Sequence, residues 1–170
     1  MLILSLQGVE HLLDPWKQAY SDSTVLSTSV VALHLLGMLF GGGLAIAADR
    51  TTLMLRGESA EQRNQHLIDL NQLHRPVLIA IALQFATGIA MLASDLKTFV
   101  ASPFLWIKLG FVALLLINGV LLERTESALR NAFDGERDAG LWGRLRFNAI
   151  TSLILWSATL VAGITLTNAA

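Results

Sequence analysis

The sequence predicts an all-α integral membrane protein, built as a bundle of four transmembrane helices. Of its 170 residues, 54% are hydrophobic and only 15% are charged, and the mean hydropathy is +0.57. A soluble domain usually carries about 25% charged residues. Four long apolar stretches and a strongly uneven distribution of arginine complete the evidence for this fold class.

Residues 1–22 are predicted to form an amphipathic helix at the membrane interface. Apolar and aromatic residues recur there at helical spacing, opposite Glu10, Lys17 and Gln18. A helix of this kind lies on the membrane surface or packs against a partner. The stretch has no basic segment followed by a small-residue cleavage motif, so we expect no removable signal peptide.

Residues 23–170 are predicted to form the transmembrane domain. A helix needs about 20 mostly apolar residues to cross roughly 30 Å of hydrocarbon. The stretches that meet this requirement are 25–48, 76–93, 104–122 and 148–168. None carries the charged stripe expected of a helix in a soluble bundle. We also expect a helix to start near Ala60, with a capping box of Ser59 and Gln62, and to run into the second span with a bend near Pro76.

Arginine predicts the orientation of these spans. All nine arginines lie in the connections between spans one and two and between spans three and four: Arg50, Arg56, Arg63, Arg75, Arg124, Arg130, Arg137, Arg144 and Arg146. The other side carries only Lys17, Lys97 and Lys108. The positive-inside rule therefore places both connections in the cytoplasm and both termini on the periplasmic side of a bacterial inner membrane.

A weak internal repeat draws attention to His34 and Lys108. Each precedes an acidic-Arg-Thr tripeptide by fifteen residues, and Gly88-Ile89 of span two matches Gly163-Ile164 of span four at nearly the same offset. Two hairpins of equal direction would be related by an axis along the membrane normal. His34 would then lie roughly 13 Å and Lys108 roughly 6 Å from the outer ends of their spans, at 1.5 Å per residue.

These two residues are the candidate site. Ionisable groups inside a membrane are costly and mark functional positions by default. His34 is the candidate metal ligand, and Gly37 and Gly41 on its helical face are candidate cofactor contacts, because small residues admit a flat ligand or another backbone. Simpler interpretations stay open: His34 as a hydrogen-bonded core imidazole, Lys108 extending to the headgroups, and the glycines as helix-packing positions.

Other polar residues predict structural roles. Gln84 and Asn118 are expected to form hydrogen bonds between helices, and Asp49-Arg50 and Glu123-Arg124 to set helix ends at the interface. His66, Asp69 and His74 have loose metal-ligand spacing, so we expect a solvated helix face there. The absence of cysteine excludes thiolate metal sites and covalent haem attachment. A net charge of −1 gives no indication of nucleic-acid binding.

Three segments carry a family resemblance: ALHLLGMLFGGGLAIAADRTTLMLRG, HRPVLIAIALQFATGIAMLASD and PFLWIKLGFVALLLINGV. Over residues 25–122 they resemble a domain-of-unknown-function family of small bacterial membrane proteins, and are distantly similar to CopD-type and HemJ-type membrane proteins. The resemblance to HemJ-type proteins implies b-type haem bound by His34 and Lys108. The HemJ histidine-aromatic pattern at the inner end of the third span is replaced by Asn118 and Glu123-Arg124-Thr125. This difference argues against oxidase activity more than against haem binding.

The leading functional hypothesis is therefore a small haem b-binding membrane protein with an electron-transfer or redox accessory role. An alternative of another class is a cofactor-free structural subunit of a larger membrane complex or homo-oligomer. A third is a HemJ-like protoporphyrinogen oxidase. The sequence favours a role other than that of a stand-alone enzyme, and names no catalytic residue.

Overall fold

The computed structural model describes residues 2–55, 59–131 and 135–169 and is helical almost throughout. Its elements are α1 (Leu2–Asp22), α2 (Thr24–Met54), α3 (Ala60–Ser94), α4 (Leu96–Ala101), α5 (Pro103–Arg130) and α6 (Gly135–Ala169). Helices α2, α3, α5 and α6 are each long and apolar enough to cross a membrane. The predicted all-α four-helix membrane bundle is confirmed.

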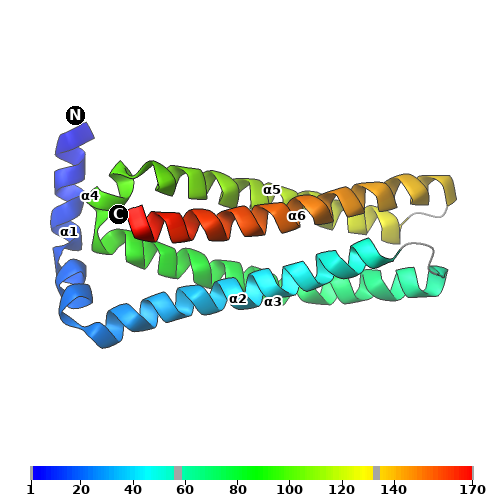
Figure 1. The fold of residues 1–170 in the computed structure, drawn as a ribbon, viewed down its shortest axis with the longest axis horizontal. Coiled ribbons are helices and arrows are strands. Elements are labelled where there is room, and N and C mark those ends of the chain that lie inside the picture. Colours follow the sequence, from blue (N-terminus) through cyan, green and yellow to red (C-terminus); the bar gives the residue numbers. More distant parts are fainter. Residues whose placement is uncertain (1, 56–58, 132–134, 170) are drawn as a thin grey trace.

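Two antiparallel hairpins make up the bundle. Helix α2 packs along α3, and α5 packs along α6. The hairpins meet mainly through α2 and α6, while α3 and α5 contact each other only briefly. Helices α2 and α5 therefore stand diagonally opposite each other. Both termini lie at the same end of the bundle (Figure 1).

Helix α1 crosses that end of the bundle (Figure 1), and its place at the membrane interface stays a prediction. Trp16 fixes it in place: its indole Nε1 donates a 2.9 Å hydrogen bond to the carbonyl of Ala90 on α3. The rings of Trp16 and Tyr20 lie 5.8 Å apart. Leu12, one helical turn before Trp16 on α1, is 81% exposed. The short helix α4, capped by Asp95, was not predicted.

Helices α3 and α6 are each 35 residues long, roughly 52 Å, and so exceed the hydrocarbon thickness by about 20 Å. The predicted start at Ala60 is confirmed, with the capping box of Ser59 and Gln62, and α3 continues unbroken through Pro76. Residues 56–58 lie outside the described part of the chain, and with them Arg56.

Two apolar clusters hold the helices together. One lies in the middle of the bundle around Leu115, Leu155 and Trp156. The other lies toward the arginine-rich end and is formed by Leu67, Leu70, Leu129, Trp142 and Leu145. The second cluster gives the helices a core to bury beyond the apolar spans, which explains why they continue past the predicted span ends.

Polar contacts reinforce the second cluster. The guanidinium of Arg63 lies over the ring of Trp142, 5.7 Å from its centroid. Arg146 donates a 2.8 Å hydrogen bond from Nη2 to the carbonyl of Leu55, at the end of α2. These contacts join α3 and α2 to α6, so arginine here connects helices as well as marking one side of the membrane.

Candidate functional site

His34 projects from α2 and is held by α3. Its Nδ1 lies 2.9 Å from Oγ1 of Thr87, and the hydroxyl of Thr87 donates to the carbonyl of Leu83 at 2.7 Å. The carbonyl of Gln84 lies 3.2 Å from the same hydroxyl; when the hydroxyl donates to either carbonyl, Thr87 Oγ1 accepts a bond from Nδ1–H of His34. The lone pair of the imidazole is then on Nε2, the atom with which a histidine oriented in this way binds a metal.

The backbone around His34 is also tied to α3. Gln84 donates from Nε2 to the carbonyl of His34 at 3.4 Å, which confirms that Gln84 bonds between helices. A Cβ added at Gly88 would lie 3.5 Å from Cε1 of His34. The imidazole therefore lies beside Gly88, which has no side chain, and within hydrogen-bond distance of Thr87.

Lys108 has the corresponding position in the second hairpin. It projects from α5 and is partly buried. A Cβ added at Gly163 on α6 would lie 3.5 Å from its Nζ.

The sequence repeat thus has a counterpart in three dimensions. His34 packs on Gly88 within the first hairpin, and Lys108 packs on Gly163 within the second. These are the same four residues that matched at nearly equal offsets along the chain. Two donor groups from diagonally opposed helices, each resting on a glycine of its hairpin partner, define the candidate site.

Gly37 and Gly41 lie where α2 approaches α3. A Cβ added at Gly37 would come within 3.2 Å of the Ala80 carbonyl and within 3.0 Å of Cγ of Gln84. At Gly41 it would come within 2.9 Å of Cβ of Ala80. Both glycines therefore permit close helix packing, and the cofactor contact predicted for them stays a prediction.

Two acidic residues behave differently from expectation. Asp49 is only 4% exposed and α2 continues beyond it to Met54, so it does not set the helix end with Arg50. Likewise α5 continues past Glu123 to Arg130. Both helices follow the second apolar cluster beyond the membrane boundary that these charges were expected to mark.

Glu126 was missed by the sequence analysis. It is 0% exposed, and neither carboxyl oxygen has a hydrogen-bond partner among the described residues. Nδ1 of His74 lies 3.9 Å from its Oε2, but also 3.0 Å from the carbonyl of Leu70. Glu126 could have been found from its spacing, because it continues the buried face of α5 defined by Leu115 and Asn118.

His66 is a second correction. It was expected on a solvated face, but it is 5% exposed and its Nε2 lies 2.8 Å from Oγ1 of Thr52 on α2. Within the described residues, no group of three or more histidine and acidic side chains is placed to hold a metal ion. Asn118 behaves as predicted, donating a 3.0 Å bond from α5 to the Asn148 carbonyl on α6.

The class defined by this fold is that of an all-α, multi-pass membrane protein with a four-helix core. Comparison of the chain with protein-family models, with curated proteins and with solved structures found no match. The functional argument therefore depends on the site geometry.

Proposed function

We propose that the protein binds haem b through His34 and serves electron transfer or an accessory redox role in a bacterial inner membrane. The observation that carries the proposal is the orientation of the imidazole. With its own proton on the carbonyl of Leu83, the Thr87 hydroxyl accepts a hydrogen bond from Nδ1–H of His34 and leaves the Nε2 lone pair available. A hydrogen-bond acceptor at the other ring nitrogen of a histidine ligand has this effect, because it fixes the tautomer and the ring plane.

The donor set fits the group. Haem b supplies a one-electron iron couple and needs an axial nitrogen or sulfur ligand from the protein. Lys108 serves in one of two ways: as an amine it is a second ligand, and as an ammonium it is a partner for a propionate. The second role needs no loss of a proton, which makes it the less demanding one for a lysine.

The packing of the bundle is compatible with a ligand between the hairpins. His34 and Lys108 stand on diagonally opposed helices, and α3 and α5 contact each other only briefly on one side of them. His34 itself is half-buried. The close contacts at Gly37 and Gly41 fix α2 against α3 and so hold His34 opposite Thr87.

A visible spectrum of the protein purified from cells with sufficient haem tests the proposal. We expect a reduced α-band in the b-type range, and we expect His34→Ala to remove it. His11→Ala is the matched control, because the His11 side chain is 87% exposed on α1, away from the spans. A dithionite-reduced wild-type protein without an α-band would refute haem binding.

A second candidate is a cofactor-free structural subunit of a larger membrane complex or a homo-oligomer. The observation that favours it is the filling of the glycine stripe by protein: Ala80 faces Gly41, and Trp156 lies against Gly42. In that case His34→Ala lowers stability or assembly through the lost bond to Thr87 and changes no absorbance. The same pair of variants therefore separates the two candidates.

A further inference from the structure

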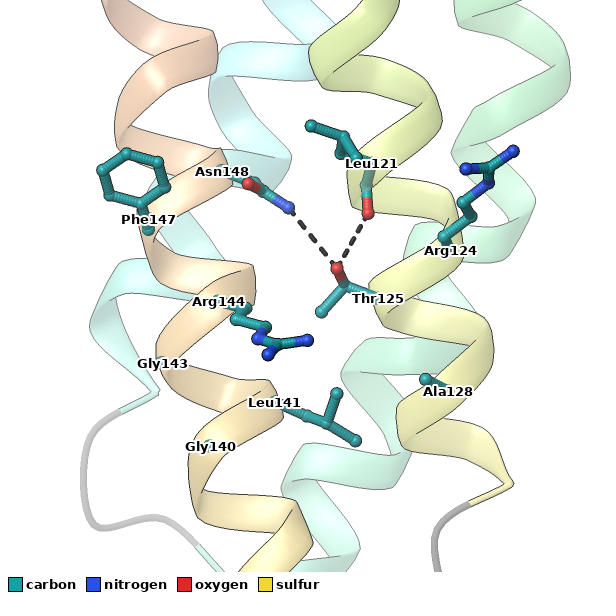
Figure 2. A pocket seen from close by; sticks show the side chains of 10 residues that line it. All are labelled: Leu121, Arg124, Thr125, Ala128, Gly140, Leu141, Gly143, Arg144, Phe147 and Asn148. Atoms are coloured by element: carbon teal, nitrogen blue, oxygen red, sulfur yellow. Dashed lines mark hydrogen bonds between the residues drawn. The ribbon is translucent and has the colours of Figure 1, made fainter.

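A groove lies between α5 and α6 at the arginine-rich end of the bundle, which is opposite the end that carries the two chain termini. It encloses about 540 Å³. Arg144, Phe147 and Gly143 line it from α6, and Leu121 and Arg124 line it from α5. Figure 2 shows that the side chain of Arg144 extends into the space between the two helices, whereas that of Arg124 leaves α5 on the far side.

Glycine keeps the groove open. A Cβ added at Gly140 or at Gly143 would meet no other atom within 4 Å, so the α6 side has free space next to its backbone. This contrasts with Gly37 and Gly41, where the neighbouring helix fills the space. Glycine also disfavours helix formation by about 1 kcal/mol relative to alanine. Helix packing accounts for the first two glycines and does not account for the two at the groove.

Arg144 lies between apolar parts of the lining along the helix axis, with Leu141 and Ala128 on the side of the connecting segments. Phe147, 70% exposed, and Leu121 lie on the side of the apolar spans. Arg144 lies about one helical turn further toward the connecting segment (Figure 2). No acidic side chain lines the groove, and Arg144 forms no salt bridge within the described residues. Polar neutral groups, Thr125 and Asn148, form its floor and bond to each other at 3.4 Å.

We propose that this groove binds an anionic glycerophospholipid, with the headgroup phosphate at Arg144 and an acyl chain along Phe147 and Leu121. Phe147 and Leu121 lie on the span side of Arg144, which is the order of acyl chain and headgroup in a lipid leaflet. Guanidinium groups bind phosphate oxygens with two parallel hydrogen bonds, and basic pockets between transmembrane helices are recurrent sites for anionic lipid headgroups.

Thermal unfolding of the purified full-length chain in detergent tests the lipid site. We expect phosphatidylglycerol to raise the unfolding temperature more than phosphatidylcholine does. Arg144→Gln should weaken the apparent affinity for phosphatidylglycerol about fivefold, the effect of one basic contact. Gly143→Leu should abolish the specific response by filling the groove, since the space it needs is free in the protein.

Two matched variants serve as controls. Arg50→Gln removes an exposed arginine of α2 that does not line the groove, and Gly119→Leu fills open space on α5 outside it. Both should respond to phosphatidylglycerol as the unaltered chain does. An equal response to phosphatidylcholine, or an unchanged response in both Arg144→Gln and Gly143→Leu, would overturn the proposal. Inorganic phosphate reproducing the shift would also overturn it, in favour of a soluble anion.

Discussion

Nδ1 of His34 and Oγ1 of Thr87 are 2.9 Å apart, and the hydroxyl proton of Thr87 is committed to the backbone of its own helix. Thr87→Val should remove the acceptor without a change of shape. We expect haem occupancy of the purified protein to fall, because the imidazole loses its orientation. Thr87→Ser should restore it. Stability should fall by about 1 kcal/mol in the valine variant.

Absorbance per mole of protein measures this effect. A valine variant with full haem occupancy would mean that Thr87 only stabilises the fold. Loss of occupancy in the serine variant as well would indicate that packing of the threonine methyl group, and not its hydroxyl, is what matters.

The neighbouring glycines of α2 provide a packing prediction. At Gly41 a Cβ would come within 2.9 Å of Cβ of Ala80, whereas at Gly43 it would meet nothing within 4 Å. Gly41→Ala should therefore cost about 1–3 kcal/mol, since α2 and α3 must separate. Gly43→Ala should be neutral or stabilise by up to about 1 kcal/mol through helix propensity. Unfolding midpoints that are equal for the two variants would contradict the close contact.

Replacement of Glu126 is expected to increase the stability of the protein. A buried carboxyl group without a hydrogen-bond partner is costly to enclose. Replacement by an apolar side chain of similar length, Glu126→Met, should raise the free energy of unfolding by about 1 kcal/mol or more. Glu123→Met, at an exposed position of the same helix, is the control and should change it little. A marked loss of stability in Glu126→Met would show that the carboxyl group has a stabilising partner.

Attachment of α1 depends on one tryptophan. Trp16→Phe keeps an aromatic ring and removes the bond to the carbonyl of Ala90. We expect faster amide hydrogen exchange within α1 and unchanged exchange in α3, because only the interfacial helix is released. Leu12→Ala alters an exposed side chain on the same helix and should leave the exchange rates as they are. Protection of α1 in the phenylalanine variant equal to that of the unaltered chain would be evidence against this anchor.

The predicted orientation can be tested with single cysteines, because the chain has none of its own. Ser21→Cys lies at the end of α1, and Asn131→Cys follows α5. With both termini outside, an impermeant maleimide added to intact spheroplasts should label position 21 and leave position 131 unlabelled until the membrane is opened. The reverse pattern would invert the topology.

Hydrophobicity sufficed to predict the four spans, because the length of apolar sequence needed to cross a bilayer is set by the bilayer itself. The capping box at Ser59 and Gln62 was predictable for a similar reason, since it depends on residues three positions apart. The ends of α2 and α5 were not. Asp49 and Glu123 seemed to mark the membrane boundary, but packing beyond the boundary extends both helices.

The candidate site was also predictable only in part from the sequence. The matched offsets of His34 and Lys108 identified which residues to compare, and the structure adds the contacts with Gly88 and Gly163. The acceptor role of Thr87 could not be predicted, because it depends on the register between α2 and α3. Burial of Glu126 was missed because its charge obscured the helical spacing that places it on the inner face of α5.

Because α3 and α6 extend past the bilayer, one part of the bundle is surrounded by water and the other by lipid. Around Leu67, Leu129 and Leu145 the helices are held together by the exclusion of water, as in a soluble bundle, whereas around Leu115 and Trp156 they are surrounded by lipid chains and depend on close fit. Urea weakens the packing around Leu67, Leu129 and Leu145 and has little access to the packing around Leu115 and Trp156. Unfolding by urea in bilayers should accordingly proceed in two stages. The arginine-rich end of the bundle should unfold first, while the spans stay inserted in the membrane.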